Sequence, residues 1–337
     1  VISFALFAPM AGMAEGPSPL PPAPARPDSE AGPTQVSYFA WIGDITKIDS
    51  VEQTFSANLV LLLRWHDPQL AHDEPGVKQY ALEDIWHPRL LVVNEIGEVV
   101  RSLPEIVFAT PDGSARYTQR FIGSFTQPLN LRAFPFDHDT FRVSIVVLGH
   151  QPEEIRLTAD PKARDIGLPD GVGIAGKLTI QDWQVTSVNA RADPYNVAPG
   201  TSIAGLAIEF TAVRKSMHFI AKVIIPLILI VMMSWAVFWI EPTDTGTQVG
   251  LAVTAMLTLI AYRFAVDSDV PKLPYLTRLD AFILFSSVLV FISLIEVMVT
   301  TKLAGRSRLE LARNIDRHCR WIFPLVFATV GAGIFLG

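Results

Sequence analysis

Two different patterns of hydrophobic and polar positions meet near Arg214. Between Val36 and Arg214, short runs rich in β-branched and aromatic residues are separated by turn residues, a pattern typical of β-strands. Strands are expected at residues 55–65, 90–93, 106–109, 117–125, 140–147, 155–157, 178–190 and 203–213. Four long apolar segments follow Arg214. The pattern therefore predicts a β domain followed by four helices.

The spacing of the expected strands is typical of an immunoglobulin-like β-sandwich. Within it, Asp112-Gly113 predicts a hairpin turn. The run Gly171-Val-Gly-Ile-Ala-Gly176 matches G-x-G-x-x-G, but no helical pattern follows it. We interpret this run as a flexible loop, because a nucleotide site of that kind requires a helix after the glycines.

Each of the four apolar segments approaches the roughly 20 residues that a membrane-spanning helix requires. Spans are expected at about residues 218–240, 245–268, 277–301 and 318–337, within a membrane domain at 217–337. Basic residues gather between the third and fourth spans, at Lys302, Arg306, Arg308, Arg313, Arg317 and Arg320. Because such clusters stay on the cytoplasmic side, the β domain at 36–216 is expected on the opposite side.

The first residues of the sequence agree with this orientation. Residues 1–14 are apolar and end in small residues, similar to the hydrophobic part and cleavage site of a secretory signal. A short disordered tail is the alternative. Residues 15–35 are rich in proline and predict a disordered leader.

Composition excludes several classes of function. The chain of 337 residues is 50% hydrophobic, which favours a membrane protein, and its net charge of −6 gives no sign of nucleic-acid binding. Its one cysteine, Cys319, permits no disulfide within the chain. The seven histidines lack the spacing of a zinc site, and no nucleophile or phosphate-binding motif occurs. We therefore expect no cofactor, no metal site and no enzymatic activity.

The second apolar segment carries a distinctive stripe of residues. Six positions recur at alternating steps of four and three, which places them on one face of a helix; they are Gly250, Thr254, Leu257, Ala261, Phe264 and Ser268. We call this set the α-helical stripe. A ring of such helices would enclose a pore, whereas small residues also favour a packing seam between buried helices. The stripe by itself leaves both interpretations open.

Several motifs occur in the order seen in one family: Trp86-His-Pro88, Phe134-Pro-Phe-Asp137, Ala212-Val-Arg214, Pro226 and Pro271-Lys-Leu-Pro-Tyr275. Together they resemble the pentameric ligand-gated ion channels. The paired cysteines of that family would fall at Gln127 and Phe141, and their absence resembles the prokaryotic branch. The resemblance implies a homopentamer in the lipid of a bacterial inner membrane, with a periplasmic ligand-binding domain.

In such a pentamer the stripe would line the pore, with Leu257 and Phe264 as the closed gate. Acidic residues at both ends of the second span imply permeating inorganic cations; they are Glu241, Asp244, Asp267 and Asp269. Arg263 is expected to point away, because it lies about 200° around the helix from Ala261. The loop from Trp239 to Val249 looks longer than in prokaryotic relatives.

The resemblance also implies a coupling site between the two domains. It pairs Arg214 with Asp137 and brings Asp49 or Glu52 near them, with Pro271 and Lys272 in the loop between the second and third spans. A purely structural salt bridge is the alternative. Glu296, near the inner end of the third span, is expected to reach the interface or a basic partner.

The family's agonist pocket lies between subunits and is lined by aromatic residues. The corresponding positions here are Val60, Val93, Leu148 and Ile203, with His150 and Tyr195 nearby. A cationic amine is disfavoured as the agonist, because none of these four corresponding positions carries an aromatic ring. His150 permits modulation by protons. The agonist, a small molecule or the proton, stays open. The alternative function is a membrane-anchored β-sandwich binding or sensor protein without conduction.

Overall fold

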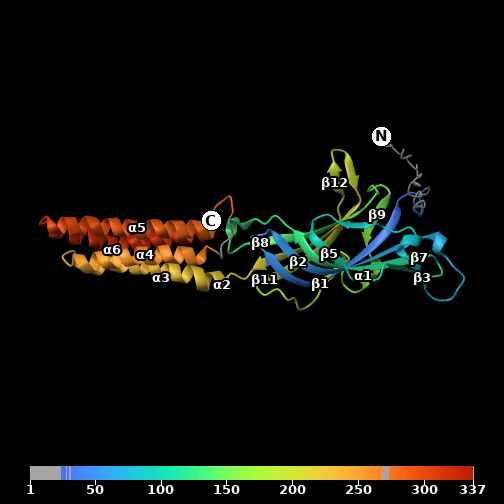
Figure 1. Ribbon diagram of the computed structural model, residues 1–337, viewed down its shortest axis with the longest axis horizontal. Coiled ribbons are helices and arrows are strands. Elements are labelled where there is room, and N and C mark those ends of the chain that lie inside the picture. The colour runs from blue at the N-terminus through green and yellow to red at the C-terminus, as the bar shows by residue number, and fades with distance from the viewer. Residues whose placement is uncertain (1–23, 28, 30–31, 268–272, 337) are drawn as a thin grey trace, which may run out of the picture.

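The computed structural model describes residues 24–27, 29, 32–267 and 273–336. A β domain and a helical bundle lie end to end along the longest axis of the molecule (Figure 1). The expected signal segment and most of the expected leader lie outside the described residues. The end of the leader is ordered, because the first strand already begins at Thr34.

The β domain contains two main sheets and a separate hairpin. Sheet A has the order β10-β1-β2-β7-β6-β3, with β5 paired to β7 and β9 paired to β1. Sheet B has the order β11-β14-β8-β4, and β12 pairs with β13. The strands are β1 (Thr34–Asp49), β2 (Thr54–His66), β3 (Lys78–Ala81), β4 (Leu90–Val92), β5 (Glu95–Arg101), β6 (Ile106–Ala109), β7 (Ser114–Thr126), β8 (His138–Val147), β9 (Ile155–Ala159), β10 (Val172–Ile174), β11 (Trp183–Ala192), β12 (Tyr195–Ala198), β13 (Thr201–Ile203) and β14 (Gly205–Arg214).

Aromatic side chains from both sheets form the core of the sandwich. Strand β2 alternates buried and partly exposed residues along almost its whole length, as expected for a strand with one face on a core. Phe55 of β2 contacts Phe125 of sheet A at 5.3 Å and Phe210 of sheet B at 5.4 Å between ring centroids. Phe141 stacks on Phe210 at 4.9 Å. The contact between Phe55 and Phe210 joins the two sheets, and the other two pairs extend the aromatic core within each sheet.

The structure corrects two expectations about the β domain. The run at 171–176 is not a flexible loop, because β10 within it pairs in parallel with β1. The expected strand at 178–190 begins only at Trp183, since Asp44 holds Thr179 through hydrogen bonds to its backbone and side chain. The turn at Asp112-Gly113 connects β6 and β7 as expected. Gly113 has φ of +81°, and a Cβ there would lie 2.6 Å from the Asp67 carbonyl oxygen.

Among the described residues, four helical segments are long and apolar enough to cross a membrane. The first, Met217–Trp239, joins the short helix α2 (Met217–Phe219) to α3 (Ile225–Ala236) through a π-helical turn at Ile220–Ile224. Pro226 follows that turn and cannot donate a backbone hydrogen bond, which explains the irregular helix before it. The other segments are α4 (Thr245–Val266), α5 (Arg278–Gly305) and α6 (Leu309–Leu336).

Helix α4 begins at Thr245, the residue at which the second span was expected to begin. One helix begins earlier than expected. Helix α6 begins at Leu309, well before the expected residue 318, and Arg313, Arg317 and Arg320 therefore lie on the helix.

The early start of α6 changes the surroundings of Glu296. This residue does not reach a basic partner as expected but lies beside Asp316 of α6. All four carboxyl oxygens of the pair are buried, and among the described residues none has a hydrogen-bond partner outside the pair. The sequence could not show this pairing, because Asp316 was placed outside the fourth span.

Candidate pore helix and coupling site

The two faces of α4 have different surroundings within one chain. Gln248, Ala252, Ala255, Leu259 and Val266 are buried against the rest of the bundle. The stripe lies on the other side: Gly250, Thr254 and Ala261 are exposed, and the exposed fractions of Leu257 and Phe264 are 61% and 79%. Ser268 lies outside the described residues. Within the chain, the described part of the stripe is therefore not a packing seam.

Threonine hydroxyls on this exposed surface donate to the helix itself. Thr254 Oγ1 donates to the Gly250 carbonyl at 2.7 Å, and Thr258 Oγ1 donates to the Thr254 carbonyl at 2.8 Å. Their oxygens keep acceptor capacity toward the outside. The inner end of the stripe is therefore small and polar, whereas Leu257 and Phe264 make the rest apolar.

The acidic residues near α4 fall into different environments. Asp244 caps the helix, accepting from the Thr247 backbone N–H at 3.3 Å, and remains exposed. Glu241 pairs with Arg313 of α6 at 3.2 Å in an exposed position, and Arg313 also pairs with Glu310 at 3.3 Å. Asp267 follows the last residue of α4 and is exposed, while Asp269 lies outside the described residues. Arg263 lines a cavity with Asp280 of α5, which agrees with its position off the stripe.

Arg214 and Asp137 form a buried ion pair where the β domain meets the bundle. Arg214 donates from Nε to Asp137 Oδ1 at 2.8 Å and from a terminal nitrogen to Oδ2 at 3.0 Å. The side chains are only 5% and 1% exposed. The guanidinium also lies over the rings of Trp183 and Phe134, 4.2 and 4.9 Å from their centroids. The bidentate geometry fixes the arginine strongly.

The residue of the β1–β2 turn that contacts Arg214 is Ser50, not Asp49 or Glu52 as expected. A terminal guanidinium nitrogen donates to Ser50 Oγ at 2.7 Å. Asp49 instead pairs with Lys47 at 2.7 Å and accepts from the backbone of Val51 and Glu52. The turn between β1 and β2 therefore touches the pair through a hydroxyl, because the carboxylate of Asp49 is used to close the turn itself.

The loop before Asp137 rests on the membrane domain. Phe134 accepts through its carbonyl from the Leu279 backbone at the start of α5, at 3.2 Å, and its ring contacts Phe219 of α2 at 4.7 Å. The Tyr275 hydroxyl bonds the Leu131 backbone N–H at 3.2 Å. Pro271 and Lys272 lie outside the described residues. This loop thus contacts the first span, the beginning of the third span, and the segment between the second and third spans.

Sequence reasoning missed four members of this site: Ser50, Phe134, Trp183 and Tyr275. Phe134 and Tyr275 lie inside two of the motifs named above. Their aromatic rings within those motifs were the signal that could have identified them as members of the site. Ser50 and Trp183 carried no such signal, because they meet Arg214 only through strand pairing and the β1–β2 turn.

Asp139 lies two residues after Asp137 and is partly buried. One of its carboxyl oxygens is enclosed with no hydrogen-bond partner among the described residues. Burial raises the pKa of Asp139, and the neighbouring Asp137 charge adds to the increase. A backbone hydrogen bond from Asn130 and the charges of His138 and Arg214 oppose it.

Replacing Asp139 with asparagine is expected to raise the melting temperature of the protein near neutral pH. A raised pKa in the folded state means that folding favours the protonated acid. The stabilisation that the protonated Asp139 gives the folded state is complete below the ordinary aspartate pKa of about 3.9. It is lost as pH rises through the raised pKa of Asp139 in the folded state. The advantage of Asp139→Asn should therefore shrink toward acid pH in thermal melts. Asp165→Asn on the exposed surface is the control, and an advantage that grows toward acid pH would contradict this account.

The expected agonist-pocket residues do not meet in one cavity of a single chain. Leu148 and His150 line a cavity of about 420 Å³ together with Trp86, His87 and Arg89. Tyr195 and Ile203 face each other across the β12–β13 hairpin, Val60 lies on β2 of sheet A, and Val93 follows β4. His150 contacts the Trp86 ring at 5.9 Å and lies 3.5 Å from Glu154.

The β-sandwich rests through one loop on four membrane spans, and one of the spans presents an exposed stripe of polar and apolar residues. This architecture defines the subunit of a ligand-gated ion channel with an extracellular β domain. Comparison with known families agrees. Residues 23–216 match the neurotransmitter-gated ion-channel ligand binding domain, and residues 223–310 match the transmembrane region of the same channels. The chain belongs to this family of pentameric ligand-gated ion channels.

A bacterial relative defines the branch of the family. The chain is 30% identical over 301 residues, 88% of its length and 80% of the relative, to a proton-gated ion channel of Gloeobacter violaceus. The chain is thus a prokaryotic member of this family of ion channels: a multi-pass membrane channel with an extracellular N-terminal domain.

Proposed function

We propose that five copies of this chain surround a pore lined by α4, and that the channel conducts inorganic cations. The exposed stripe opposite the buried face of α4 carries this proposal. From Gly250 to Phe264 the stripe extends over about 21 Å at 1.5 Å per residue. Five copies would give a wide, wettable inner mouth, because Gly250 and Thr254 are small, and apolar rings at Leu257 and Phe264. Narrow apolar rings block ions by dewetting.

The membrane-anchor alternative explains less of the structure. An anchor needs apolar residues against lipid, as on α6, where Trp321 and Leu325 are strongly exposed. It has no use for Gly250 and Thr254 aligned with Leu257 on an exposed face. It also gives no reason for the contacts that join the loop from Leu131 to Asp137 to three parts of the membrane domain.

Cation preference rests on Asp244. Asp244 caps the start of α4 and is exposed, whereas Glu241 is held in an ion pair with Arg313. We therefore assign the charge of the inner ring to Asp244. An acidic ring raises the local concentration of cations. The described part of the stripe carries no basic side chain.

We propose that the activating signal is extracellular and acts at subunit interfaces of the β domain. The proton is the first agonist to test. The Gloeobacter violaceus relative is a proton-gated channel, and here a partly buried acid, Asp139, adjoins the pair of Asp137 and Arg214.

The test is current recording on reconstituted protein during steps from about pH 7 to about pH 4, which cross the ordinary pKa values of histidine and glutamate and approach that of aspartate. In a NaCl gradient the wild-type reversal potential should approach that of Na⁺. Asp244→Asn should shift it toward zero while keeping the helix cap, because asparagine caps equally well. Asp165→Asn should leave it unchanged. An unaltered reversal potential in Asp244→Asn would exclude this residue from selectivity, and a wild-type preference for chloride would refute cation conduction.

A further inference from the structure

A cavity of about 680 Å³ opens on the exposed face of sheet A, at the end of the β domain far from the bundle. It crosses the ends of β9, β1, β2, β7 and β6 and the start of the short helix α1 (Pro161–Asp165). It includes none of the residues of the pore, the coupling site or the expected agonist pocket. The cavity is large enough for a small organic molecule, since ligand pockets measure about 300–1,000 Å³.

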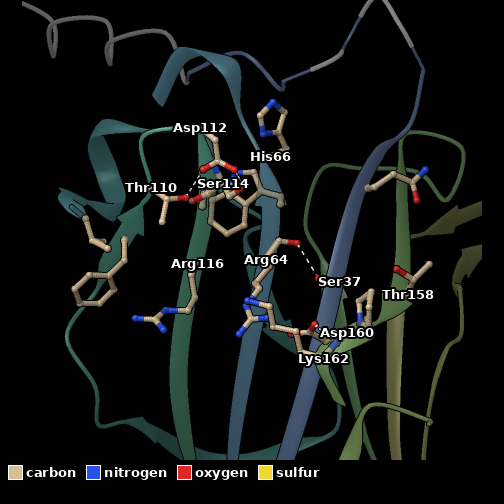
Figure 2. A pocket seen from close by; sticks show the side chains of 16 residues that line it. Ser37, Arg64, His66, Thr110, Asp112, Ser114, Arg116, Thr158, Asp160 and Lys162 are labelled. Atoms are coloured by element: carbon tan, nitrogen blue, oxygen red, sulfur yellow. Dashed lines mark hydrogen bonds and ion pairs between the residues drawn. The ribbon is translucent and has the colours of Figure 1, made fainter. Parts of the chain in front are cut away.

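Two arginines lie directly opposite each other in this cavity. The pairing of β2 with β7 sets Arg64 against Arg116, and the neighbouring registers continue the row to Ser37 and Phe108. Figure 2 shows Arg64 and Arg116 on adjacent strands, with Asp160 and Lys162 beside Arg64. Like charges opposite each other destabilise a sheet. An anion between them would remove this repulsion.

The acids of the cavity do not balance its basic groups. Asp160, buried, pairs with Arg64 at 2.7 Å. Asp112 is held within its own turn, accepting hydrogen bonds from Thr110 and Ser114, which lower its pKa to about 2. Arg116 lies over the Phe108 ring at 5.2 Å. Among the described residues, neither Arg116 nor Lys162 has an ion-pair partner within 4 Å.

We propose that this cavity binds a small organic carboxylate. Its carboxylate would lie between Arg64, Arg116 and Lys162, because guanidinium groups bind carboxylates with charge-assisted, often bidentate hydrogen bonds. Its apolar body would pack on Phe108 and Val77, an exposed apolar residue of the wall. The volume and this apolar wall favour an organic anion over an inorganic ion.

The position of the cavity links it to the coupling site. Strands β1 and β2 contribute Ser37 and Arg64 at one end and are joined at the other end by the turn that carries Ser50. A ligand that draws β1, β2 and β7 together acts on the hairpin that touches Arg214.

The test measures benzoate binding to the full-length protein in detergent by calorimetry and thermal shift, with benzyl alcohol as the neutral analogue. Benzoate should bind, and benzyl alcohol should bind at least tenfold more weakly. Arg116→Gln and Lys162→Gln should each weaken benzoate binding about tenfold, equivalent to about 1.4 kcal/mol. Arg164→Gln is the matched control, because Arg164 is exposed on the same short helix but does not line the cavity.

Equal binding of benzoate and benzyl alcohol would overturn the proposal, as would unchanged benzoate affinity in either pocket variant. Melting temperatures of all three variants show whether each is folded, and Lys162→Gln tests the site even if Arg116→Gln does not fold. Benzoate binding is measured without recording current. A negative binding result would therefore disprove this site without bearing on whether the channel conducts.

Discussion

Replacing Arg214 with alanine is expected to abolish agonist-evoked current. The substitution leaves the Asp137 carboxylate buried without its bidentate partner. Loss of one partner of a buried pair costs about 3–5 kcal/mol, and the guanidinium contacts with Trp183 and Phe134 are lost with it. The Phe134–Asp137 loop would then no longer hold the β domain against α5. Current per assembled channel at the cell surface is the measurement.

Two variants separate coupling from assembly. Arg214→Lys keeps the charge but not the fork of donors, so it should assemble and respond weakly. Arg191→Ala is the matched control, because Arg191 also pairs with a carboxylate, Glu209, but is itself 47% exposed. Glu209 keeps a second basic partner, Arg142, at 3.8 Å, so the responses of this variant should be normal. Ordinary agonist responses in Arg214→Ala and Asp137→Ala would show that the pair has only a structural role.

Leu257→Ser and Phe264→Ala are each expected to produce a large current without agonist. A hydroxyl at Leu257 or a lost ring at Phe264 would let water remain in a constriction that an apolar ring keeps dry. Both side chains are exposed in the single chain, so neither substitution opens a cavity in the subunit core. The measurement is the current without agonist, recorded with and without a cation large enough to block the pore.

Leu325→Ser provides the matched control for the gate. Leu325 on α6 is 64% exposed, close to the 61% of Leu257, and undergoes the same change of side chain. Helix α6 packs mainly on α5 rather than on the proposed pore helix α4. Basal currents that rise equally in Leu325→Ser and Leu257→Ser would point to general damage, and no rise in either stripe variant would favour the membrane anchor.

Local pattern predicted the strands whose faces are clearly alternating and missed those without that signal. The segment at 106–109 was predicted with its observed ends, and β2 differs by one residue at each end. Strand β1 was missed, because Gly43 and Asp44 interrupt its alternation beside two register shifts. Strand β10 was missed because three residues in a glycine-rich run carry no periodicity, and only pairing with β1 makes them a strand.

The amino-acid sequence alone determined the two-domain order, the four apolar spans and the face of α4 that carries the stripe. These properties depend on the periodicity of neighbouring residues, which a sequence displays directly. The tertiary structure decided which residues meet: Ser50 with Arg214, Arg313 with Glu241, and Arg64 opposite Arg116. Such partners depend on strand register and on where each helix begins, and a shift of one residue turns a side chain to the other face.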